Sequence, residues 1–200
     1  KVFLHECLHA FSLDFHEMNT ARYKTLWKNH FNYINSDFNV NESYCEFWAN
    51  IMNLCYYSYD YCNGNFKEFV MSFEINVRLE QLFSIMQVNK ILNFYGMNYD
   101  MMNSGKENNS LKTLYKEDTN VFCYYIIKSI LLYNYHEVFN WCNENNLNFI
   151  QFKASYKNID KFIKFIFKLR NNKKYKKLIN KYENSINNDN MEMCLFEFMF

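Results

Sequence analysis

The sequence predicts a mainly α-helical protein with a single domain. Its 200 residues include no Pro and three Gly, so few residues would interrupt a long helix. Half of the residues are hydrophobic, which suffices for a substantial core at this length. Apolar residues recur at helical spacing along most of the chain, whereas strand-like alternation is weak and restricted to 147–152 and 193–198.

The first expected helix covers 1–18. It carries an apolar stripe at helical spacing, formed by Leu4, Leu8, Phe11 and Phe15. The segment 19–41 is less regular, and its polar end indicates a loop. The second helix is expected over 42–62, with Asn41 as its N-cap.

The rest of the chain is expected to continue as helices joined by polar loops. The expected helices are 65–95, 119–133, 135–145, 157–170, 173–185 and 191–199. The segment 97–118 is the clearest surface loop, and it separates a part at 1–96 from a helical part at 119–200. We expect one domain over 1–200, because neither part alone offers a self-sufficient core. The first residue is Lys rather than Met, so we expect the native chain to extend upstream.

Composition restricts the class of protein. The formal net charge is +1, so no overall charge favours binding to nucleic acid. The seven Cys are an odd number with no C-x-x-C pair, a pattern typical of free thiols in a reducing compartment. No signal peptide or membrane-spanning apolar run is visible. These features predict a cytoplasmic protein without a membrane span.

The most informative motif is His5-Glu6-Cys7-Leu8-His9, an H-E-x-x-H pattern. Residues i and i+4 lie on one face of a helix, so His5 and His9 can present two imidazole nitrogens to one metal ion. Glu6 lies about 100° around the helix from His5, where it can reach a water molecule at the metal without being a ligand. The pattern therefore predicts a Zn²⁺ site with Glu6 as the catalytic base.

A catalytic zinc ion takes a third protein ligand. In metzincins this is a His that follows a Gly, but the corresponding positions here are Ser12 and Phe15. His16 misses by one position, and on a continuous helix it would lie about 10 Å along the axis from His9. We therefore reject the metzincin pattern.

The expected helix 42–62 offers Glu42 and Glu46 as carboxylate ligands. Glu42 is also explained by the helix dipole, whereas Glu46 lies among aromatic residues and needs a partner. We therefore prefer Glu46 as the ligand and keep Glu42 as the alternative; a water-facing Glu46 is also open. Asn50 is expected to hydrogen-bond a liganding histidine.

Residues 1–54, with the motif His5–His9 and the segment Glu46-Phe47-Trp48-Ala49, resemble the gluzincin branch of zincin metallopeptidases. They are also similar to zincin-like proteins of large DNA viruses. The resemblance implies a zincin-like helical domain in which the motif helix packs on a second, Glu-bearing helix. It implies a zinc-dependent metallopeptidase acting on a peptide or protein substrate, in a host cytoplasm or virion if the chain is viral.

Two other functions stay open. One is a catalytically inactive helical protein with a viral structural or host-interaction role. The other is binding of nucleic acid or an anionic surface through the basic segment 161–181. We consider nucleic acid the less favoured partner, because a solvated face over an apolar stripe explains that segment better.

Overall fold

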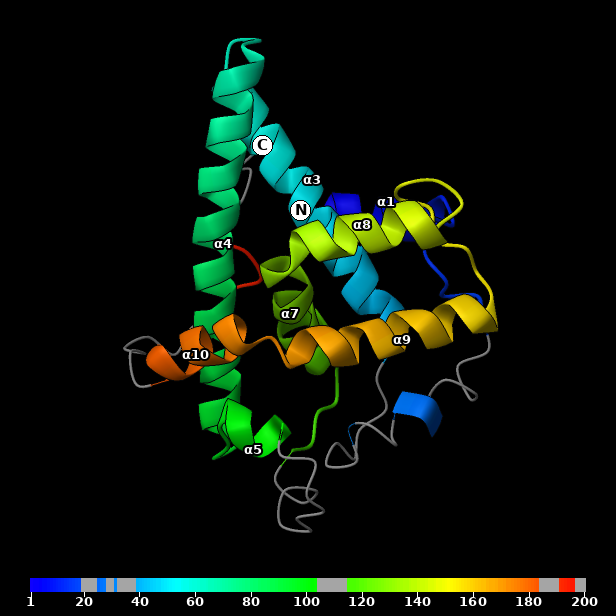
Figure 1. Cartoon of the computed structure of the whole chain (residues 1–200), viewed down its shortest axis with the longest axis vertical. Helices are drawn as coiled ribbons and strands as arrows, with labels where there is room; N and C mark the ends of the chain where they lie inside the picture. Colours follow the sequence, from blue (N-terminus) through cyan, green and yellow to red (C-terminus); the bar gives the residue numbers. More distant parts are fainter. Residues whose placement is uncertain (19–24, 28–30, 32–38, 104–114, 184–190, 197–200) are drawn as a thin grey trace.

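The computed structural model describes residues 1–18, 25–27, 31, 39–103, 115–183 and 191–196 (Figure 1). Every regular element in these ranges is a helix, which confirms the mainly α prediction. The weak strand signals at 147–152 and at 193–196 correspond to irregular chain, and the expected helix at 191–199 is absent from its described part.

The longest elements are α3 (Val40–Asp60) and α4 (Phe66–Phe94), which pack side by side as a hairpin (Figure 1). The connecting turn uses Asn63 and Gly64 at φ values of 46° and 80°. Asn65 then caps α4, because its side chain accepts hydrogen bonds from two main-chain N–H groups of the first turn, at 3.0 and 3.4 Å. These helices match the expected ranges 42–62 and 65–95 closely, but α3 begins at Val40, so its N-cap position is Asn39 and the expected N-cap Asn41 lies inside the helix.

The centre of the molecule is formed by a π-helix, η1 (Phe122–Ile127), and α7 (Lys128–Tyr133). Residues 128–132 are all buried, and the helices packed around α7 include α3, α4, α8 (Tyr135–Asn145) and α9 (Tyr156–Arg170). The expected helix at 119–133 therefore exists, but its first part has the wider π-helical winding that often occurs at functional sites.

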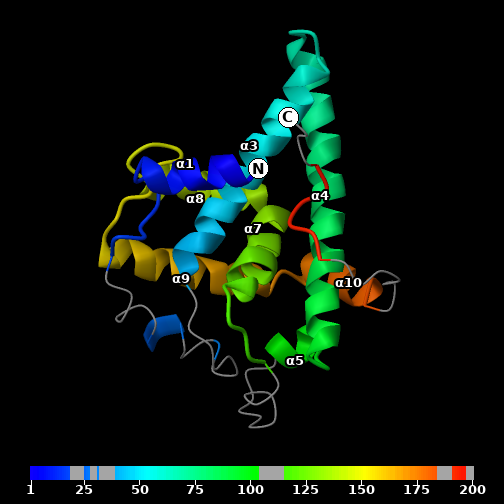
Figure 2. The ribbon, with the colours of Figure 1, turned by 180° about the vertical axis from the view of Figure 1, so that it is seen from behind.

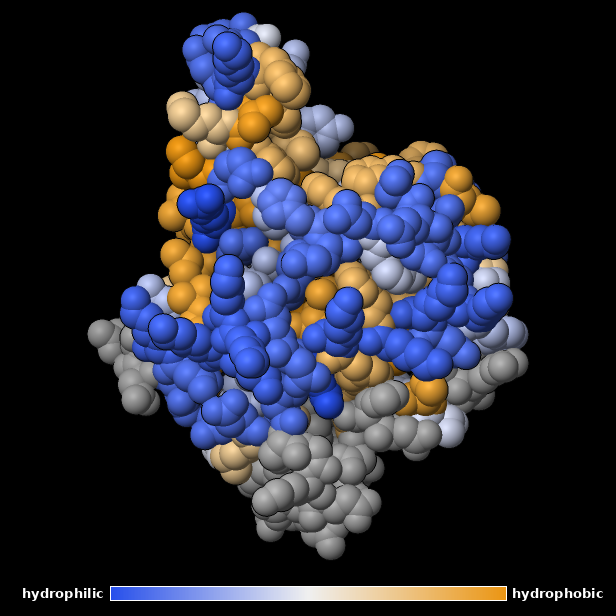
Figure 3. Space-filling model, viewed as in Figure 1, coloured by the Kyte–Doolittle hydropathy of each residue, from blue (hydrophilic) through white to orange (hydrophobic). Residues whose placement is uncertain are grey.

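Two further helices, the short α5 (Tyr99–Asn103) and α10 (Lys173–Lys181), pack against each other, and α10 also packs against α4. Helix α5 lies inside the segment 97–118, which was expected to be a loop; residues 104–114 lie outside the described chain. Figure 3 shows hydrophilic side chains over much of the face formed by α9 and α10.

The N-terminal helix α1 (Val2–Ala10) lies across α3 (Figure 2) and is shorter than the expected 1–18. It ends in a Schellman motif: Ser12 N–H donates to His9 O and Leu13 N–H donates to Leu8 O, both at 2.9 Å. Ser12 takes the left-handed conformation that Gly usually supplies, with φ 50°. The prediction of a continuous helix was wrong because no Gly marks this turn.

None of the helices in the described residues is both long enough and apolar enough to cross a membrane. All seven cysteines are free thiols, five of them buried, as the sequence predicted.

The left-handed Ser12 predicts a stabilising substitution. Ser12→Gly should raise the free energy of unfolding by about 1 kcal/mol, because Gly adopts this conformation without a Cβ clash. Urea denaturation followed by circular dichroism measures the change. Ser12→Ala is the matched control: it also removes the hydroxyl but keeps Cβ, so it should give no gain. An equal gain from both variants would contradict the conformational explanation.

Candidate metal centre

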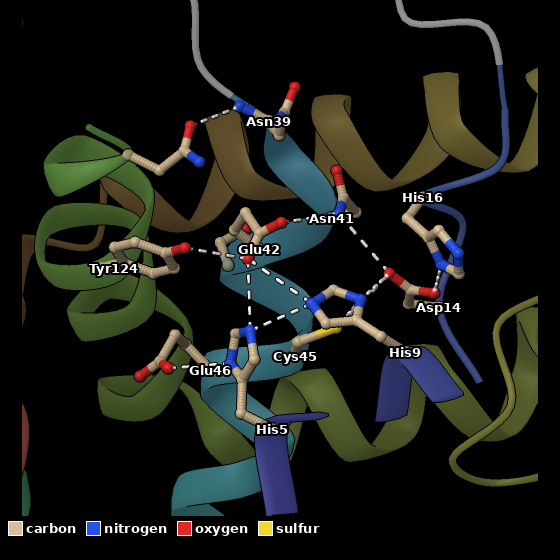
Figure 4. A network of polar contacts seen from close by, with 12 residues as sticks. His5, His9, Asp14, His16, Asn39, Asn41, Glu42, Cys45, Glu46 and Tyr124 are labelled. Carbon is tan, nitrogen blue, oxygen red and sulfur yellow. Dashed lines mark hydrogen bonds and ion pairs between the residues drawn. The ribbon is translucent and has the colours of Figure 1, made fainter. Parts of the chain in front are cut away.

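The predicted motif lies where α1 packs on the N-terminal half of α3. Almost every residue of α3 from Val40 to Leu54 is buried, including Asn41 and Glu46. Buried polar side chains need partners, and here the partners come from α1 and from the turn that follows it. Figure 4 shows the resulting network of imidazoles and carboxylates.

Three potential ligand atoms of this network face one another. His5 Nε2 lies 3.0 Å from His9 Nε2 and 3.2 Å from Glu42 Oε2, and His9 Nε2 lies 3.6 Å from the same oxygen. In a tetrahedral zinc site with bonds of about 2.0–2.1 Å, neighbouring donor atoms are about 3.3 Å apart. The two nitrogens and one oxygen thus already have the spacing of one face of such a site.

The second nitrogen of each imidazole faces another carboxylate. His5 Nδ1 is 2.8 Å from Glu46 Oε1, an ion-pair distance without hydrogen-bond alignment, and His9 Nδ1 is 2.9 Å from Asp14 Oδ2. A carboxylate behind a histidine fixes the ring orientation and leaves Nε2 for a metal, an arrangement that recurs around protein zinc ions. His9 therefore has a hydrogen-bonded carboxylate behind it, and His5 has a carboxylate at ion-pair distance.

Further side chains hold the carboxylates in place. Tyr124, from η1, donates its hydroxyl to Glu42 Oε2 at 3.1 Å, and the Asn41 amide donates to Glu42 Oε1 at 3.1 Å. Lys1 forms a close ion pair with Glu46. Glu42 is thus held from two sides, with one oxygen directed at both imidazoles.

The geometry separates the two candidate carboxylates. Glu42, which was the alternative ligand, faces the Nε2 atoms of both histidines, whereas the preferred Glu46 faces Nδ1 of His5. The reason is that Glu42 and Glu46 lie one helical turn apart on α3, so that each faces a different nitrogen of the His5 ring. The ligand set that fits this arrangement is His5, His9 and Glu42, with Glu46 as the support of His5.

Two other predicted residues lie outside the cluster of donor atoms. Glu6 is on an exposed side of α1, next to His5 in the sequence. Asn50 is fully buried, but its amide donates to Glu80 Oε1 on α4 at 3.2 Å instead of to a histidine. One turn beyond Glu46, α3 faces α4 and no longer faces α1, which explains the different partner.

His16 lies near the centre, contrary to the expectation of a long separation from His9. The rings of His9 and His16 are 5.4 Å apart, and Asp14 connects them: its Oδ1 is 2.5 Å from His16 Nδ1. The expectation assumed a continuous helix, whereas the turn at Ser12 brings the chain back. His9, Asp14 and His16 form a second group of potential metal ligands. Both carboxylate oxygens of Asp14 are already hydrogen-bonded, one to the ring of His9 and the other to the ring of His16.

Cys45 is part of the network without being a nucleophile. Its thiol is 3.5 Å from Asp14 Oδ2, and burial together with the Asp14 charge raises the pKa of this thiol well above the ordinary range. The thiol is therefore protonated and donates to Asp14. Cys7, in the middle of the motif, is half-buried.

The electrostatics of the centre favour an imidazolium when no metal is present. Burial alone would lower the pKa of His5, but Glu42 and Glu46 outweigh it and raise this pKa to about 9. Burial likewise tends to raise the pKa of Glu42, but His5 and His9 outweigh it, so the pKa is lowered. Burial and the Glu42 charge raise the pKa of Tyr124 to about 12, so its phenol remains a hydrogen-bond donor.

Sequence reasoning missed several members of this network. They are Lys1, Asp14, His16, Asn41, Cys45 and the specific role of Tyr124. The turn at Ser12 had no Gly to indicate it, and Tyr124 is one of 17 tyrosines, so neither carried a usable signal. His136 is exposed on α8, and its ring lies tilted against that of Tyr135, with the two centroids 3.9 Å apart.

The basic segment 161–181 has the pattern of a solvated helix face. Lys161, Lys164 and Lys168 are exposed, whereas the apolar residues between them are buried in the core, apart from the half-buried Phe165. Comparison of the chain with protein-family models, with curated proteins and with solved structures finds no match. The geometry of the centre is therefore the main basis for a functional proposal.

The raised pKa of His5 predicts a pH-dependent stability of the metal-free protein. The folded pKa of about 9 lies above the ordinary histidine pKa of 6.5, so the His5 ion pairs contribute fully below pH 6.5. This contribution is lost as the pH rises through 9, and amounts to about 3 kcal/mol. Urea denaturation between pH 6 and about 10, with a chelator present, measures it.

The His5→Gln variant isolates this effect. It lacks the titrating group, so its unfolding free energy should fall less steeply over the same pH range. His136→Gln, which changes an exposed histidine on α8, should keep the wild-type slope. A wild-type slope in His5→Gln would show that the ion pairs of His5 do not govern the pH dependence.

Proposed function

We propose that the protein is a zinc-dependent metallopeptidase whose metal ligands are His5, His9 and Glu42. The observation that carries the proposal is the convergence of two Nε2 atoms and one carboxylate oxygen at 3.0, 3.2 and 3.6 Å from one another. Three protein ligands leave the fourth tetrahedral position for water, which is the usual composition of a catalytic zinc site.

The residues present fit Zn²⁺ by their chemistry as well as by their spacing. Imidazole nitrogen and carboxylate oxygen are ligands that zinc accepts, and each histidine has a carboxylate on its other nitrogen. When bound, zinc acidifies a water molecule and polarises the carbonyl of a substrate. Asp14 and Glu46 would keep both rings oriented throughout the reaction.

The chain supplies a group for the proton transfers of peptide hydrolysis. Glu6 would accept the proton of the attacking water and return it to the leaving amine. The Tyr124 hydroxyl, which donates its one proton to Glu42 Oε2, would hold that carboxylate in place as a ligand. The described residues contain no strand to pair with a peptide, so helix side chains would have to hold the substrate.

The two carboxylates of α3 provide a matched test of the ligand set. Glu42→Gln should lower the affinity for zinc about a thousandfold, because it removes a ligand atom. Glu46→Gln, one turn away on the same helix, should lower it only about tenfold, because it removes a support of His5. Elemental mass spectrometry gives the zinc content, and competition with a chromophoric chelator gives the affinity.

Glu144→Gln, an exposed substitution on α8, should leave zinc binding unchanged. If Glu46→Gln has the larger effect, Glu46 is the ligand and Glu42 the supporting group. If the wild-type protein takes up no zinc even from a supplemented solution, the metal-centre proposal is rejected.

The role of Glu6 separates metal binding from catalysis. Glu6→Gln should retain about one zinc ion per chain, because the side chain is not a ligand. Its cleavage rate should fall about a hundred- to ten-thousandfold, because the general base is lost. A fluorogenic peptide library measures cleavage, with Glu144→Gln as the active control. Undiminished cleavage by Glu6→Gln would exclude this base, and a zinc-loaded wild type that cleaves nothing would favour the catalytically inactive alternative.

A further inference from the structure

A cavity of about 830 Å³ lies between the C-terminal end of α4, η1 and the segment 191–196. It is lined by Lys90, Ile91, Asn93, Phe94, Tyr95, Val121, Tyr125 and Met191. Its volume is within the range of about 300–1,000 Å³ that small-molecule pockets occupy. None of these residues belongs to the proposed metal centre.

The lining offers mostly rings and aliphatic carbon. The lining has three uncharged polar side chains. Asn93 donates to Glu183 O at 3.1 Å, the Tyr95 hydroxyl donates to Lys116 O at 2.7 Å, and the third is the phenol of Tyr125. Phe94 is 83% exposed, although it is large and apolar. A ligand would therefore meet three aromatic side chains and three aliphatic ones, with Lys90 as the charged group.

The walls of the cavity are held in place by the rest of the fold. Ile91 is only 5% exposed and belongs to the core. Met191 begins the segment 191–196, whose main chain is anchored from three helices. Two of its N–H groups donate to side chains of α4: Glu192 N to Gln87 and Leu195 N to Glu80. Two of its carbonyl oxygens accept from side chains: Met193 O from Lys128 on α7, and Phe196 O from Asn53 on α3. A pocket with such walls is largely preformed, which lowers the entropic cost of binding.

The cavity and the metal centre share one element. In η1, Tyr124 contacts Glu42, and the next residue, Tyr125, lines the cavity. The Glu46 charge also contributes to the raised pKa of Tyr125, after burial. Consecutive residues of η1 therefore contact the two sites.

We propose that this cavity binds an aromatic ring, either of a small molecule or of a peptide side chain. Ring faces and edges stabilise one another by stacking, and the three lining rings offer such contacts from both α4 and η1. The binding goes beyond the proposed peptidase activity and does not require zinc.

The test uses the whole chain and the fluorescent probe anilinonaphthalene sulfonate, with and without a chelator. The probe should bind saturably at one site, equally well in both conditions. Phe94→Ala and Tyr125→Ala should each weaken binding about fivefold, the value of one ring contact. Val121→Trp, which fills the cavity from the residue before η1, should abolish it.

Phe66→Ala is the matched control, because Phe66 is 75% exposed at the opposite end of the same helix. It should leave the affinity for the probe unchanged. Equal weakening by Phe66→Ala and Phe94→Ala, or no weakening by Phe94→Ala, would overturn the proposal. Phe94 is on the surface, so its loss does not threaten folding; circular dichroism verifies the fold of Tyr125→Ala and Val121→Trp.

Displacement of the probe then identifies the source of the ring. Displacement by N-acetyltryptophanamide alone assigns the cavity to a small aromatic molecule. Stronger displacement by a capped Ala-Trp-Ala tripeptide assigns it to a peptide side chain. If neither compound displaces the probe, the cavity is not a site for aromatic rings and the proposal fails. Zinc content is measured on the same samples, so a failure here is distinct from a failure of the metal centre.

Discussion

The burial of two carboxylates between α1 and α3 is the constraint on which this end of the molecule depends. Glu46 and Glu42 have side chains only 3% and 14% exposed, and a buried charge is costly without a partner. The partners are the imidazole of His5 and the ammonium group of Lys1, both supplied by the start of the chain. The position of α1 on α3 and the pairing of these charges therefore support each other.

The same atoms serve the metal-free protein and the proposed zinc site. Without a metal, His5 holds a proton between two carboxylates, and its raised pKa reflects their attraction, which outweighs burial. A zinc ion would take the place of this proton between His5, His9 and Glu42, so metal and proton compete for one position. The supporting carboxylates, Asp14 and Glu46, keep their role in both states. The centre is thus preorganised by interactions that also stabilise the fold.

Helix α3 also connects this centre to a second buried polar cluster. One turn beyond Glu46, Asn50 bonds Glu80, whose other oxygen accepts Leu195 N–H at 2.8 Å. Burial raises the pKa of Glu80 and lowers that of Lys128, and the two side chains lie 3.9 Å apart. Glu80 and Lys128 therefore also depend on their hydrogen bonds to the main chain of 191–196, in addition to their mutual ion pair. They hold the segment that forms one wall of the cavity, so α3 supports both proposed sites.

The amino-acid sequence by itself determined the helical class, the long helices α3 and α4 and the pairing of His5 with His9. These depend on local spacing, on the scarcity of Pro and Gly and on capping residues such as Asn65, all of which act within a few residues. Only the tertiary structure decided that Glu42 faces both histidines, that Asp14 and His16 return to His9 and that Tyr124 joins them. Those contacts depend on how α1, α3 and η1 pack and on a left-handed Ser12. Helical spacing leaves both the packing and the turn undetermined, because each arises from contacts between segments far apart in the chain or from a conformation that Ser seldom adopts.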